Sequence, residues 1–565
     1  MEPQAKKPRT DKTRPMTTQN STINLLPAEK LLRELLLGCR AHMQNTGLAA
    51  ASNLEMWITG GWVRDRLLGI PCSDVDIALS TMTGSQFGES LTEYFNLDED
   101  RFTNRASEIG LQTSSVFTGF HTTKLNLRKS KNLETTIGKV FGLDVDLVNL
   151  RKEVYDDDSR TPVMEFGTAQ EDAFRRDATV NSLFFNLDTQ QVVDLTGRGL
   201  DDMAAGVIRT PLEPHKTFMD DPLRVLRLIR IGSKLGYSVE EKTERSMGDA
   251  EIHAALGVKV SRERVGIEVL KMMRQPNPQF ALKSLFEADL YHTVFLERNS
   301  SLRKALQHEL PTQEVERPWP MSWQRTYQLL ARLLVDEESE LGRMIRAEES
   351  VENLWLMAAF APLAGLPQDM RSQAVAAFSE SIKTTSKQTK LLEEAMQNMD
   401  SIRRTIALVN EKQDKPPTRS SIGMALRSWS WSWRPQVLCS LLTQVVYETS
   451  LPWSLPSADA DATLGGFLAQ YNTFLDFVTR EGLHDVRAMK SLLGGKAIMD
   501  LFGLRKGGPF LGKALRRRGS GMAPWAEGSA GRSARQGMCA REGGLSMLRK
   551  QAGPCAPPRG RRVEL

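Results

Sequence analysis

Two aspartates separated by one residue, Asp74 and Asp76, are the side chains of this sequence best suited to bind a divalent metal. They lie in residues 73–79, which we expect to form a strand, and side chains two apart on a strand share one face. Magnesium prefers such hard oxygen ligands. The paired glycines Gly60 and Gly61 precede them and would let a phosphate chain approach the backbone. A metal held beside a phosphate site would suit nucleotidyl transfer.

Two further residues extend this candidate site. Arg64 lies in an expected helix, 62–68, and would help the paired glycines to place a triphosphate. Asp146 lies in an expected strand, 143–151, and could deprotonate or orient an attacking hydroxyl. The alternative for Asp146 is an exposed strand acid without a catalytic role. A DxD pair standing alone would more often be solvated, but its spacing from the glycines favours the metal site.

A second group of polar residues, Arg176, Asp177 and Asn181, follows about a hundred residues later. On the helix that we expect here, Asp177 and Asn181 are four apart and face the same way. Together they offer an acceptor and a donor for ribose hydroxyls, and Arg176 can reach a phosphate. The alternative is a capping cluster on the surface.

A third group, Asp221, Arg224 and Arg227, has a spacing of three that would align it along one helix. A carboxylate next to a guanidinium can address the amino group and ring edge of cytosine or adenine. Uracil and guanine carry a carbonyl in place of that amino group, so the group could select C and A. The alternative for Asp221, which precedes Pro222, is a helix cap.

The elements that would position these groups change character along the chain. Helical and strand patterns mix up to about residue 205, and the strand signals fade after about residue 210. The mixed part includes an expected helix at 26–39 and short strands at 57–58 and 192–195. The later helices are expected at 222–235, 261–273, 278–288, 323–334, 351–360 and 381–409.

Three segments lack such patterns. Residues 98–139 are polar and rich in Thr, Ser, Asn and Lys, so we expect a long mobile loop or a hairpin, and loops of this length are often functional. Residues 1–24 are expected to be a disordered leader. Residues 516–565 consist largely of Gly, Ala, Arg and Ser without periodicity, and we expect a disordered basic tail.

The composition of the 565 residues sets further bounds. Residues 516–565 carry eleven Lys/Arg and three Asp/Glu, so the remaining chain sums to about −3 although the whole is +5. A nucleic-acid surface must therefore be a local patch. The five cysteines lack CxxC spacing, which argues against a zinc site or disulfide framework and favours a reducing compartment. No apolar run approaches the roughly 20 residues of a membrane span.

Taken together, the three groups resemble the motifs of CCA-adding tRNA nucleotidyltransferases of the eukaryotic and bacterial class, which share their head domain with bacterial poly(A) polymerases. The segment with Asp74 and Asp76 is similar to the metal-binding motif of that family, and residues 175–181 are similar to its RRDxxxN ribose-selecting motif. Residues 220–224 are similar to its EDxxR base-selecting motif, but begin with Asp220 in place of Glu. Two supporting motifs match as well, at residues 194–201 and 261–264.

The resemblance implies an α+β protein with a small mixed sheet in a nucleotidyltransferase head, followed by all-helical neck, body and tail domains. The expected divisions are 25–205 for the head, 206–290 for the neck with base selection, and 291–515 for the tRNA-binding body and tail. The implied reaction is the stepwise, template-independent addition of C, C and A to the tRNA 3′ end from CTP and ATP, by two-metal nucleotidyl transfer with Mg²⁺ bound by the paired aspartates. Residues 98–139 are a candidate lever for the switch from C to A.

Several alternatives remain open. A poly(A) polymerase or a CC-adding enzyme would use the same head, and a catalytically inactive RNA-binding scaffold would belong to a different class of protein. The adjacent pair His484–Asp485 suggests a phosphohydrolase module as a further alternative. The sequence has only seven histidines, without clustered partners, which argues against it. We expect a monomer that does not enter a membrane. Mitochondrion, nucleus and cytoplasm are all open as compartments.

Overall fold

The computed structural model describes most of the chain. The described residues are 22–112, 116–123, 135–154, 163–296, 300–309, 323–411, 417–448, 458–486 and 488. The predicted tail, 516–565, and nearly all of the predicted leader, 1–24, lie outside them.

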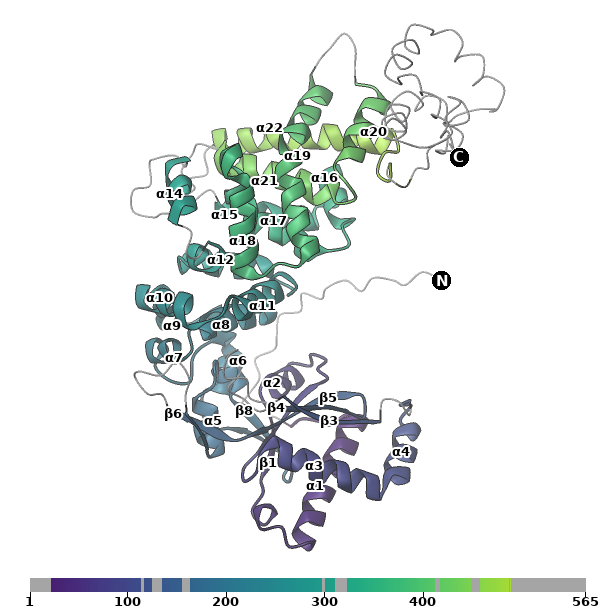
Figure 1. Ribbon diagram of the computed structural model, residues 1–565, viewed down its shortest axis with the longest axis vertical. Coiled ribbons are helices and arrows are strands. Elements are labelled where there is room, and N and C mark those ends of the chain that lie inside the picture. The colour runs from purple at the N-terminus through teal and green to yellow at the C-terminus, as the bar shows by residue number, and fades with distance from the viewer. Residues whose placement is uncertain are drawn as a thin grey trace, which may run out of the picture. The chain divides into compact units, whose positions relative to one another are not determined.

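A seven-stranded mixed sheet forms the centre of the first part of the described chain (Figure 1). Its strand order is β3-β4-β5-β2-β1-β8-β9, and only the β2–β5 pair is parallel. The strands are β1 (Met56–Thr59), β2 (Asp74–Leu79), β3 (Phe117–Thr123), β4 (Thr135–Val140), β5 (Leu143–Asn149), β8 (Leu183–Asn186) and β9 (Val192–Asp194). A separate antiparallel pair is formed by β6 (Arg151–Val154) and β7 (Val163–Phe166). The predicted small mixed sheet is confirmed.

Six described helices belong to the same part of the chain as this sheet. They are α1 (Pro27–Asn45), α2 (Gly61–Leu67), α3 (Gly84–Leu97), α4 (Glu99–Glu108), α5 (Ala169–Phe174) and α6 (Gly199–Ala205). Helix α3 contacts β3, β4 and β5, and α1 lies against α3 (Figure 1). The approach of α3 to the sheet is close, because a Cβ atom on Gly84 would lie 2.2 Å from the carbonyl oxygen of Leu147. Glycine at this position lets the helix begin directly over β5.

The segment predicted as a loop or hairpin, 98–139, contains both a helix and a hairpin. The hairpin is confirmed, since β3 and β4 pair in antiparallel fashion. The loop interpretation was wrong for residues 99–108, which form α4. This helix buries only Phe102 and Ala106, one turn apart, so its apolar periodicity is too sparse to read from the sequence.

The next part of the chain is helical apart from one short strand pair. Its helices are α7 (Pro214–Asp220), α8 (Leu223–Leu235), α9 (Glu241–Met247), α10 (Ala250–Lys259), α11 (Arg262–Met273), α12 (Pro278–Glu287) and α13 (Tyr291–Phe295). The parallel pair β10 (Val207–Ile208) and β11 (Ser238–Val239) corrects the expectation of an all-helical neck. Each of these strands spans two residues, which is too short to give an alternating pattern.

The remaining described chain is helical. Its helices are α14 (Ser300–Glu309), α15 (Trp323–Val335), α16 (Glu340–Arg346), α17 (Val351–Ala364), α18 (Arg371–Ile382), α19 (Ser386–Asn410), α20 (Arg419–Ser428), α21 (Trp433–Tyr447) and α22 (Ala458–Arg480). Helix α17 is buried from Leu354 onwards and contacts α15, α18 and α21, so it forms the core of this part. Among the described helices, none combines the length and apolar character that crossing a membrane requires.

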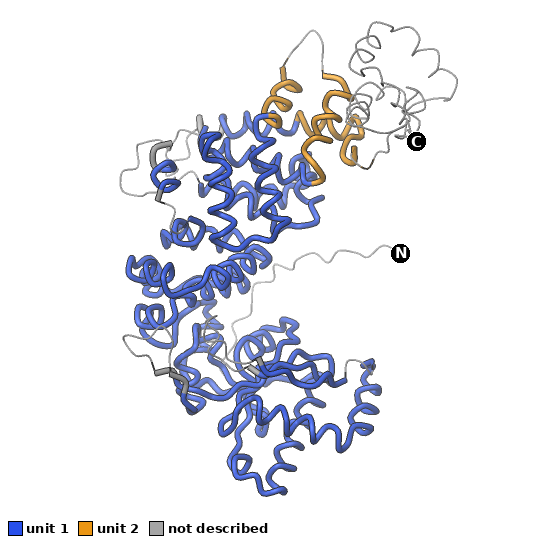
Figure 2. The backbone as a smooth tube through the Cα atoms, in the orientation of Figure 1, with its two compact units in different colours: residues 1–400, 432–472 blue, residues 401–431, 473–565 orange. Residues whose placement is uncertain are grey.

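By its contacts the chain divides into two compact units, residues 1–400 with 432–472, and residues 401–431 with 473–565 (Figure 2). The predicted divisions at residues 205 and 290 fall inside the first unit. They therefore stay predictions.

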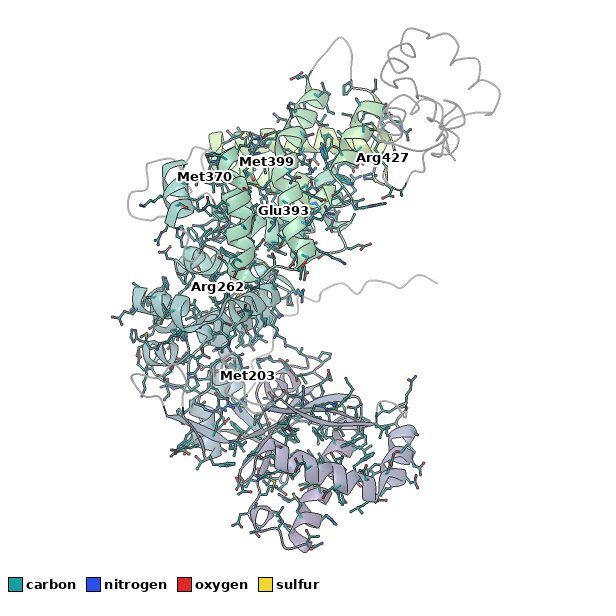
Figure 3. All side chains as sticks on the ribbon, viewed as in Figure 1. Met203, Arg262, Met370, Glu393, Met399 and Arg427 are labelled. Carbon is teal, nitrogen blue, oxygen red and sulfur yellow. The ribbon has the colours of Figure 1, made fainter. Side chains whose placement is uncertain are left out.

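Arg262, labelled in Figure 3, ties together helices of the first unit. Its Nε donates to the carbonyl of Ser381 at 2.8 Å, and its Nη1 donates to the carbonyl of Thr293 at 3.1 Å. The start of α11 is thereby fixed to the ends of α13 and α18. This contact gives the 261–264 segment a structural role.

Candidate active site

The aspartates predicted to bind metal are adjacent in the sheet to a second pair. In the parallel ladder of β2 and β5, Asp74 lies beside Asp144 and Asp76 lies beside Asp146. Residues paired across a ladder share a face, so all four carboxylates project from the same side of the sheet. The opposite face of β2 carries the buried Val75, so the strand alternates as the sequence predicts.

Burial and neighbouring charges raise the pKa of two of these carboxylates, Asp76 and Asp146. Burial raises the pKa of Asp76 to about 6, with Arg176 opposing the rise and the charges of Asp74 and Asp146 adding to it. Burial, and then the charges of Asp74 and Asp144, also raise the pKa of Asp146. The face therefore holds negative charge that its protein neighbours do not fully compensate. A divalent cation would compensate it, so the donors fit Mg²⁺.

The number of protein ligands for such an ion is small. Among the described residues, no three His, Cys, Asp or Glu side chains form a ready-made metal site. Magnesium commonly binds through one or two carboxylates and takes its other ligands from water and substrate phosphates. The sparse donor set therefore suits Mg²⁺ better than a structural metal that needs a full protein cage.

Gly60 brings bare backbone next to these carboxylates. Its φ of +74° is in the region that favours glycine. A Cβ atom here would lie 3.0 Å from Oδ2 of Asp76 and 3.4 Å from Nη1 of Arg176. The glycine is therefore required by backbone conformation and by space, and a side chain would fill the site.

A pocket of about 360 Å³ opens at this point. Its charged lining consists of six arginines and three aspartates: Arg151, Arg175, Arg176, Arg224, Arg227, Arg264, Asp76, Asp177 and Asp221. The excess of positive charge suits a polyanion such as a triphosphate. Thr59, Gly60, Gly61, Val148 and Asn181 complete the lining.

The pocket brings together nine of the twelve predicted site residues. The three outside its lining are Asp74, Asp146 and Arg64. Asp74 and Asp146 flank Asp76, Asp74 along β2 and Asp146 across the ladder. Arg64 is a different case, because its side chain is buried. Its Nε and Nη2 lie 2.9 and 2.7 Å from Oδ1 of Asp65, and its Nη1 donates to Oδ1 of Asn181. Its triphosphate contact therefore stays a prediction, and the contact that the structure shows is with Asn181.

Asp177 and Asn181 meet, but not on the α-helix that we predicted. Helix α5 ends at Phe174, and residues 179–181 form a single 3₁₀ turn. Oδ1 of Asp177 accepts hydrogen bonds from the backbone N–H of Ala178 at 2.9 Å and from Nδ2 of Asn181 at 3.0 Å. A side chain that binds the adjacent backbone competes with helix formation, which explains the error.

Arg227 contacts Asp177 in addition to lining the pocket. Its Nε and Nη2 both lie 2.7 Å from Oδ2 of Asp177. Burial would raise the pKa of Asp177, but the charge of Arg227 and the Asn181 amide outweigh burial and hold the pKa well below its ordinary value. Arg227 was predicted to select bases, and the structure places its guanidinium against the ribose candidate.

The other two base-selecting candidates lie at the junction of α7 and α8. Oδ1 of Asp221 accepts from the backbone N–H of Leu223 at 3.2 Å, although the N-cap residue of α8 is Pro222. Its Oδ2 accepts from Nη2 of Arg264 at 3.3 Å. Arg224 is buried, and its Nη1 lies 3.4 Å from the carbonyl of Thr217. Asp221 and Arg224 both line the pocket.

The sequence analysis did not identify Asp172, which holds two of the pocket arginines, Arg175 and Arg176. Asp172 is buried, and its Oδ2 accepts from Arg176 at 2.9 and 2.7 Å, while its Oδ1 accepts from Nε of Arg175 at 2.9 Å. A signal was available, since an acid three and four residues before two arginines is a helical ion-pair spacing. Arg151 and Arg264 were also missed as pocket residues, and without a fold no local spacing connects them to the site.

Two family models and several curated proteins are similar to this chain. Residues 56–209 match the model of the poly(A) polymerase head domain, and residues 236–302 match a model described as a probable RNA- and SrmB-binding site of polymerase A. A nucleotidyltransferase of Purpureocillium lilacinum, lcsQ, is 35% identical over 87% of this chain and 88% of its own length. The mitochondrial CCA tRNA nucleotidyltransferase of Saccharomyces cerevisiae is 32% identical over 81% of this chain and 83% of its own length.

A solved structure shares the fold. The Thermotoga maritima CCA-adding enzyme, complexed with tRNA, superposes with a TM-score of 0.54 over 91% of this chain and 96% of that one, at 15% identity. The arrangement of a mixed sheet followed by helices is therefore common to both. On the strength of the two fungal relatives, the chain belongs to the CCA tRNA nucleotidyltransferase family of nucleotidyl-transferring enzymes.

Proposed function

We propose that this chain adds C, C and A stepwise to the 3′ end of tRNA, using CTP and ATP and releasing pyrophosphate. The observation that carries the proposal is the single pocket in which Asp76, the arginines and the base-selecting candidates Asp221 and Arg224 meet. Phosphate binding, metal binding and base selection can then act on one nucleotide. The names of the Saccharomyces and Thermotoga proteins support the same reaction.

The proposed roles follow from the positions of the side chains. Asp74 and Asp76 would hold Mg²⁺, which supplies charge neutralisation for the triphosphate and activation of the 3′-hydroxyl. Asp146, beside Asp76, would orient that hydroxyl or accept its proton. The 3′-oxygen bonds to the α-phosphorus, the bond from that phosphorus to the β-phosphate bridging oxygen breaks, and pyrophosphate leaves.

The rest of the pocket would bind the nucleotide. Gly60 and Gly61 would receive the triphosphate along their backbone, with Arg176 neutralising part of its charge. Asp177 and Asn181 would contact the ribose. Arg227 would keep Asp177 ionised, because its guanidinium lies against that carboxylate.

Asp221 and Arg224 would read the amino group and ring edge that C and A share. No nucleic-acid template is needed for such a selection. The helices after residue 291 would contact the acceptor limb of tRNA through phosphates and shape. The β3–β4 hairpin is our candidate for the lever that changes selection from C to A.

The test is incorporation into a tRNA that lacks its CCA end, with each nucleoside triphosphate alone and in combination. We expect CTP to be added first and ATP only after two C residues. Incorporation of ATP alone in long runs would indicate a poly(A) polymerase, and arrest after two C residues would indicate a CC-adding enzyme. No incorporation with Mg²⁺ present would indicate an inactive RNA-binding scaffold.

The phosphohydrolase alternative has little structural support. Nε2 of His484 lies 3.1 Å from Oγ1 of Thr479, and the described residues hold no cluster of His and acidic side chains for a metal around it. For the compartment, the yeast relative named as mitochondrial makes mitochondrial fractions the first to examine.

A further inference from the structure

Phe166 is an exposed aromatic residue next to the pocket. It ends β7, and 51% of its surface is accessible. In the β6–β7 ladder its partner is Arg151, which lines the pocket. Directly paired residues in an antiparallel ladder have Cβ atoms about 5 Å apart on one face. The ring of Phe166 therefore lies on the same face as a pocket arginine.

The opposite face of this strand pair has a different character. Lys152 and Glu165, the next pair in the ladder, form an ion pair with Nζ and Oε2 2.7 Å apart. This pair is thus polar and internally paired, whereas the neighbouring pair, Arg151 and Phe166, places an aromatic ring beside a cation. That combination is the one that binds a nucleotide base and its phosphate.

The backbone around Phe166 is tied to the pocket wall. The N–H of Gly167 donates to the carbonyl of Leu150 at 3.1 Å, and Nε of Arg175 donates to the carbonyl of Arg151 at 3.2 Å. A Cβ atom on Gly167 would come within 2.6 Å of the backbone of Arg151 and Lys152. Glycine at this position allows the close approach that holds Phe166 next to the pocket arginines.

A lone exposed hydrophobic residue is common and needs no explanation by itself. Phe166 differs because of its partner and its neighbours. Phe184 and Phe185, which lie on β8 of the seven-stranded sheet, are fully buried in the core. Leaving a phenylalanine side chain exposed forgoes the burial that those two residues gain.

We propose that Phe166 is a stacking platform for the unpaired 3′-terminal base of the RNA strand that is being extended. This inference rests on the proposed function. The incoming nucleotide is assigned to Asp221 and Arg224, which lie at the junction of α7 and α8 and at the start of α8, so the head-domain aromatic is available for the other reactant. Arg151 would contact the phosphate of the same terminal nucleotide.

The chemistry of the reaction favours stacking at this position. The terminal base is not the same throughout, because it is the tRNA's own last base before the first addition and C before the second and third. Every base has a π face, so an aromatic ring binds each of them, whereas hydrogen bonds to a base edge would discriminate between them. A primer site must tolerate this change, and a nucleotide site must not.

The experiment compares Phe166→Ala, Phe166→Leu and Phe166→Trp in steady-state addition of CTP to a tRNA lacking CCA. We expect Phe166→Ala and Phe166→Leu to raise the KM for tRNA about 5- to 100-fold and to leave the KM for CTP within about twofold. Phe166→Trp should stay near wild type. Leu97→Ala, at a residue 69% exposed at the end of α3, is the matched control for loss of an exposed apolar side chain.

A second readout is independent of turnover. A tRNA carrying 2-aminopurine as its terminal base should lose fluorescence on binding wild type or Phe166→Trp, and much less on binding Phe166→Leu. If Phe166→Ala fails to fold, as judged by circular dichroism, the two bulky variants still decide the question.

Two results would overturn the inference: Phe166→Leu binding and quenching the tRNA as well as Phe166→Trp, or a change in the KM for CTP in place of that for tRNA. Failure of the proposed function looks different. In that case wild type itself would add no nucleotide to the tRNA.

Discussion

Asp177 and Arg227, fifty residues apart in the sequence, form a salt bridge in which Oδ2 lies 2.7 Å from both Nε and Nη2. The carboxylate side chain is 6% exposed and the guanidinium side chain 39%. Arg227 also lies 4.0 Å from Glu268, to which Arg230 donates through its Nε. The pair therefore joins the ribose candidate of the head to α8, and through Glu268 to α11.

Replacing Arg227 with Met should destabilise the protein. It leaves the Asp177 carboxylate buried with only neutral hydrogen-bond donors, and breaking a buried pair costs more than an exposed one. Because the guanidinium is more than a third exposed, we expect about 1–3 kcal/mol in urea unfolding. Adding Asp177→Asn should recover part of the loss, with a coupling of about 1 kcal/mol.

Arg245→Met, which removes an exposed pair with Glu241, is the control and should change stability by less than about 0.5 kcal/mol. Strictly additive effects of the two central substitutions would contradict the pairing.

The same salt bridge predicts how stability depends on pH. The pKa of Asp177 in the folded protein lies below the unfolded value of about 3.9. Its contribution is therefore full above that unfolded value and is lost as the pH falls towards the folded pKa. Below about pH 4, the unfolding free energy of wild type should fall more steeply than that of Arg227→Met. Equal slopes in urea titrations from pH 5 to pH 2 would show that Arg227 does not set the acidity of Asp177.

How far the sequence predicts this site depends on how local each relationship is. Asp74 and Asp76 lie on one strand, so the alternation of side chains along that strand is enough to predict that they share a face. Their proximity to Asp146 depends on the β2–β5 register, which no local pattern encodes. The same holds for Arg227. Its spacing predicted that it shares one face of a helix with Arg224, but the residue that it contacts, Asp177, lies fifty residues away in the sequence.

Errors in the prediction arise where side chains compete with the backbone or with each other. Asp177 was placed on a helix because its spacing to Asn181 is four, whereas its carboxylate accepts the next backbone N–H and prevents that helix. Arg64 was predicted to contact a triphosphate because it follows the glycines; that contact stays a prediction, but the burial of the side chain was not foreseen. Its neighbour Asp65, which also accepts from Lys234 of α8 at 2.7 Å, holds it in the interior. Predicting the contacts of Asp65 with Arg64 and Lys234 would require knowing which side chains are buried.

The pKa of Asp76 leads to a prediction in which stability and activity change in opposite directions. Asp76→Asn should abolish nucleotide addition, because a proposed metal ligand is lost. Without divalent ions it should also stabilise the fold by about 1–3 kcal/mol near pH 7.5, since the half-buried carboxylate with its pKa raised to about 6 is ionised there.

The stabilisation should depend on pH in a defined direction. A carboxyl group whose folded pKa lies above its unfolded value destabilises the fold increasingly as the pH rises between those two values. The gain from Asp76→Asn should therefore be small near pH 4 and reach a plateau above about pH 6. Glu89→Gln, at an exposed carboxylate on α3, is the control and should show no such trend. A loss of stability in Asp76→Asn at pH 7.5 in EDTA would refute the argument.

Arg264 should act on nucleotide choice through Asp221. Its guanidinium holds Oδ2 of Asp221 at 3.3 Å, while the backbone of Leu223 holds Oδ1, so the carboxylate plane is fixed from both sides. Arg264→Gln removes the charged donor, and a hydrogen bond of this kind contributes about 1 kcal/mol. We expect the preference for CTP over UTP, measured as a ratio of kcat/KM values, to fall about 5- to 10-fold, with kcat for CTP changed less than about threefold. Arg264→Lys should retain part of the preference.

Arg262→Gln is the control within the same segment, since Arg262 contacts backbone carbonyls of Ser381 and Thr293. It should lower stability and leave the CTP to UTP ratio unchanged. If both glutamine variants change that ratio equally, the effect comes from the position of α11, and the orientation of Asp221 by Arg264 is not its cause.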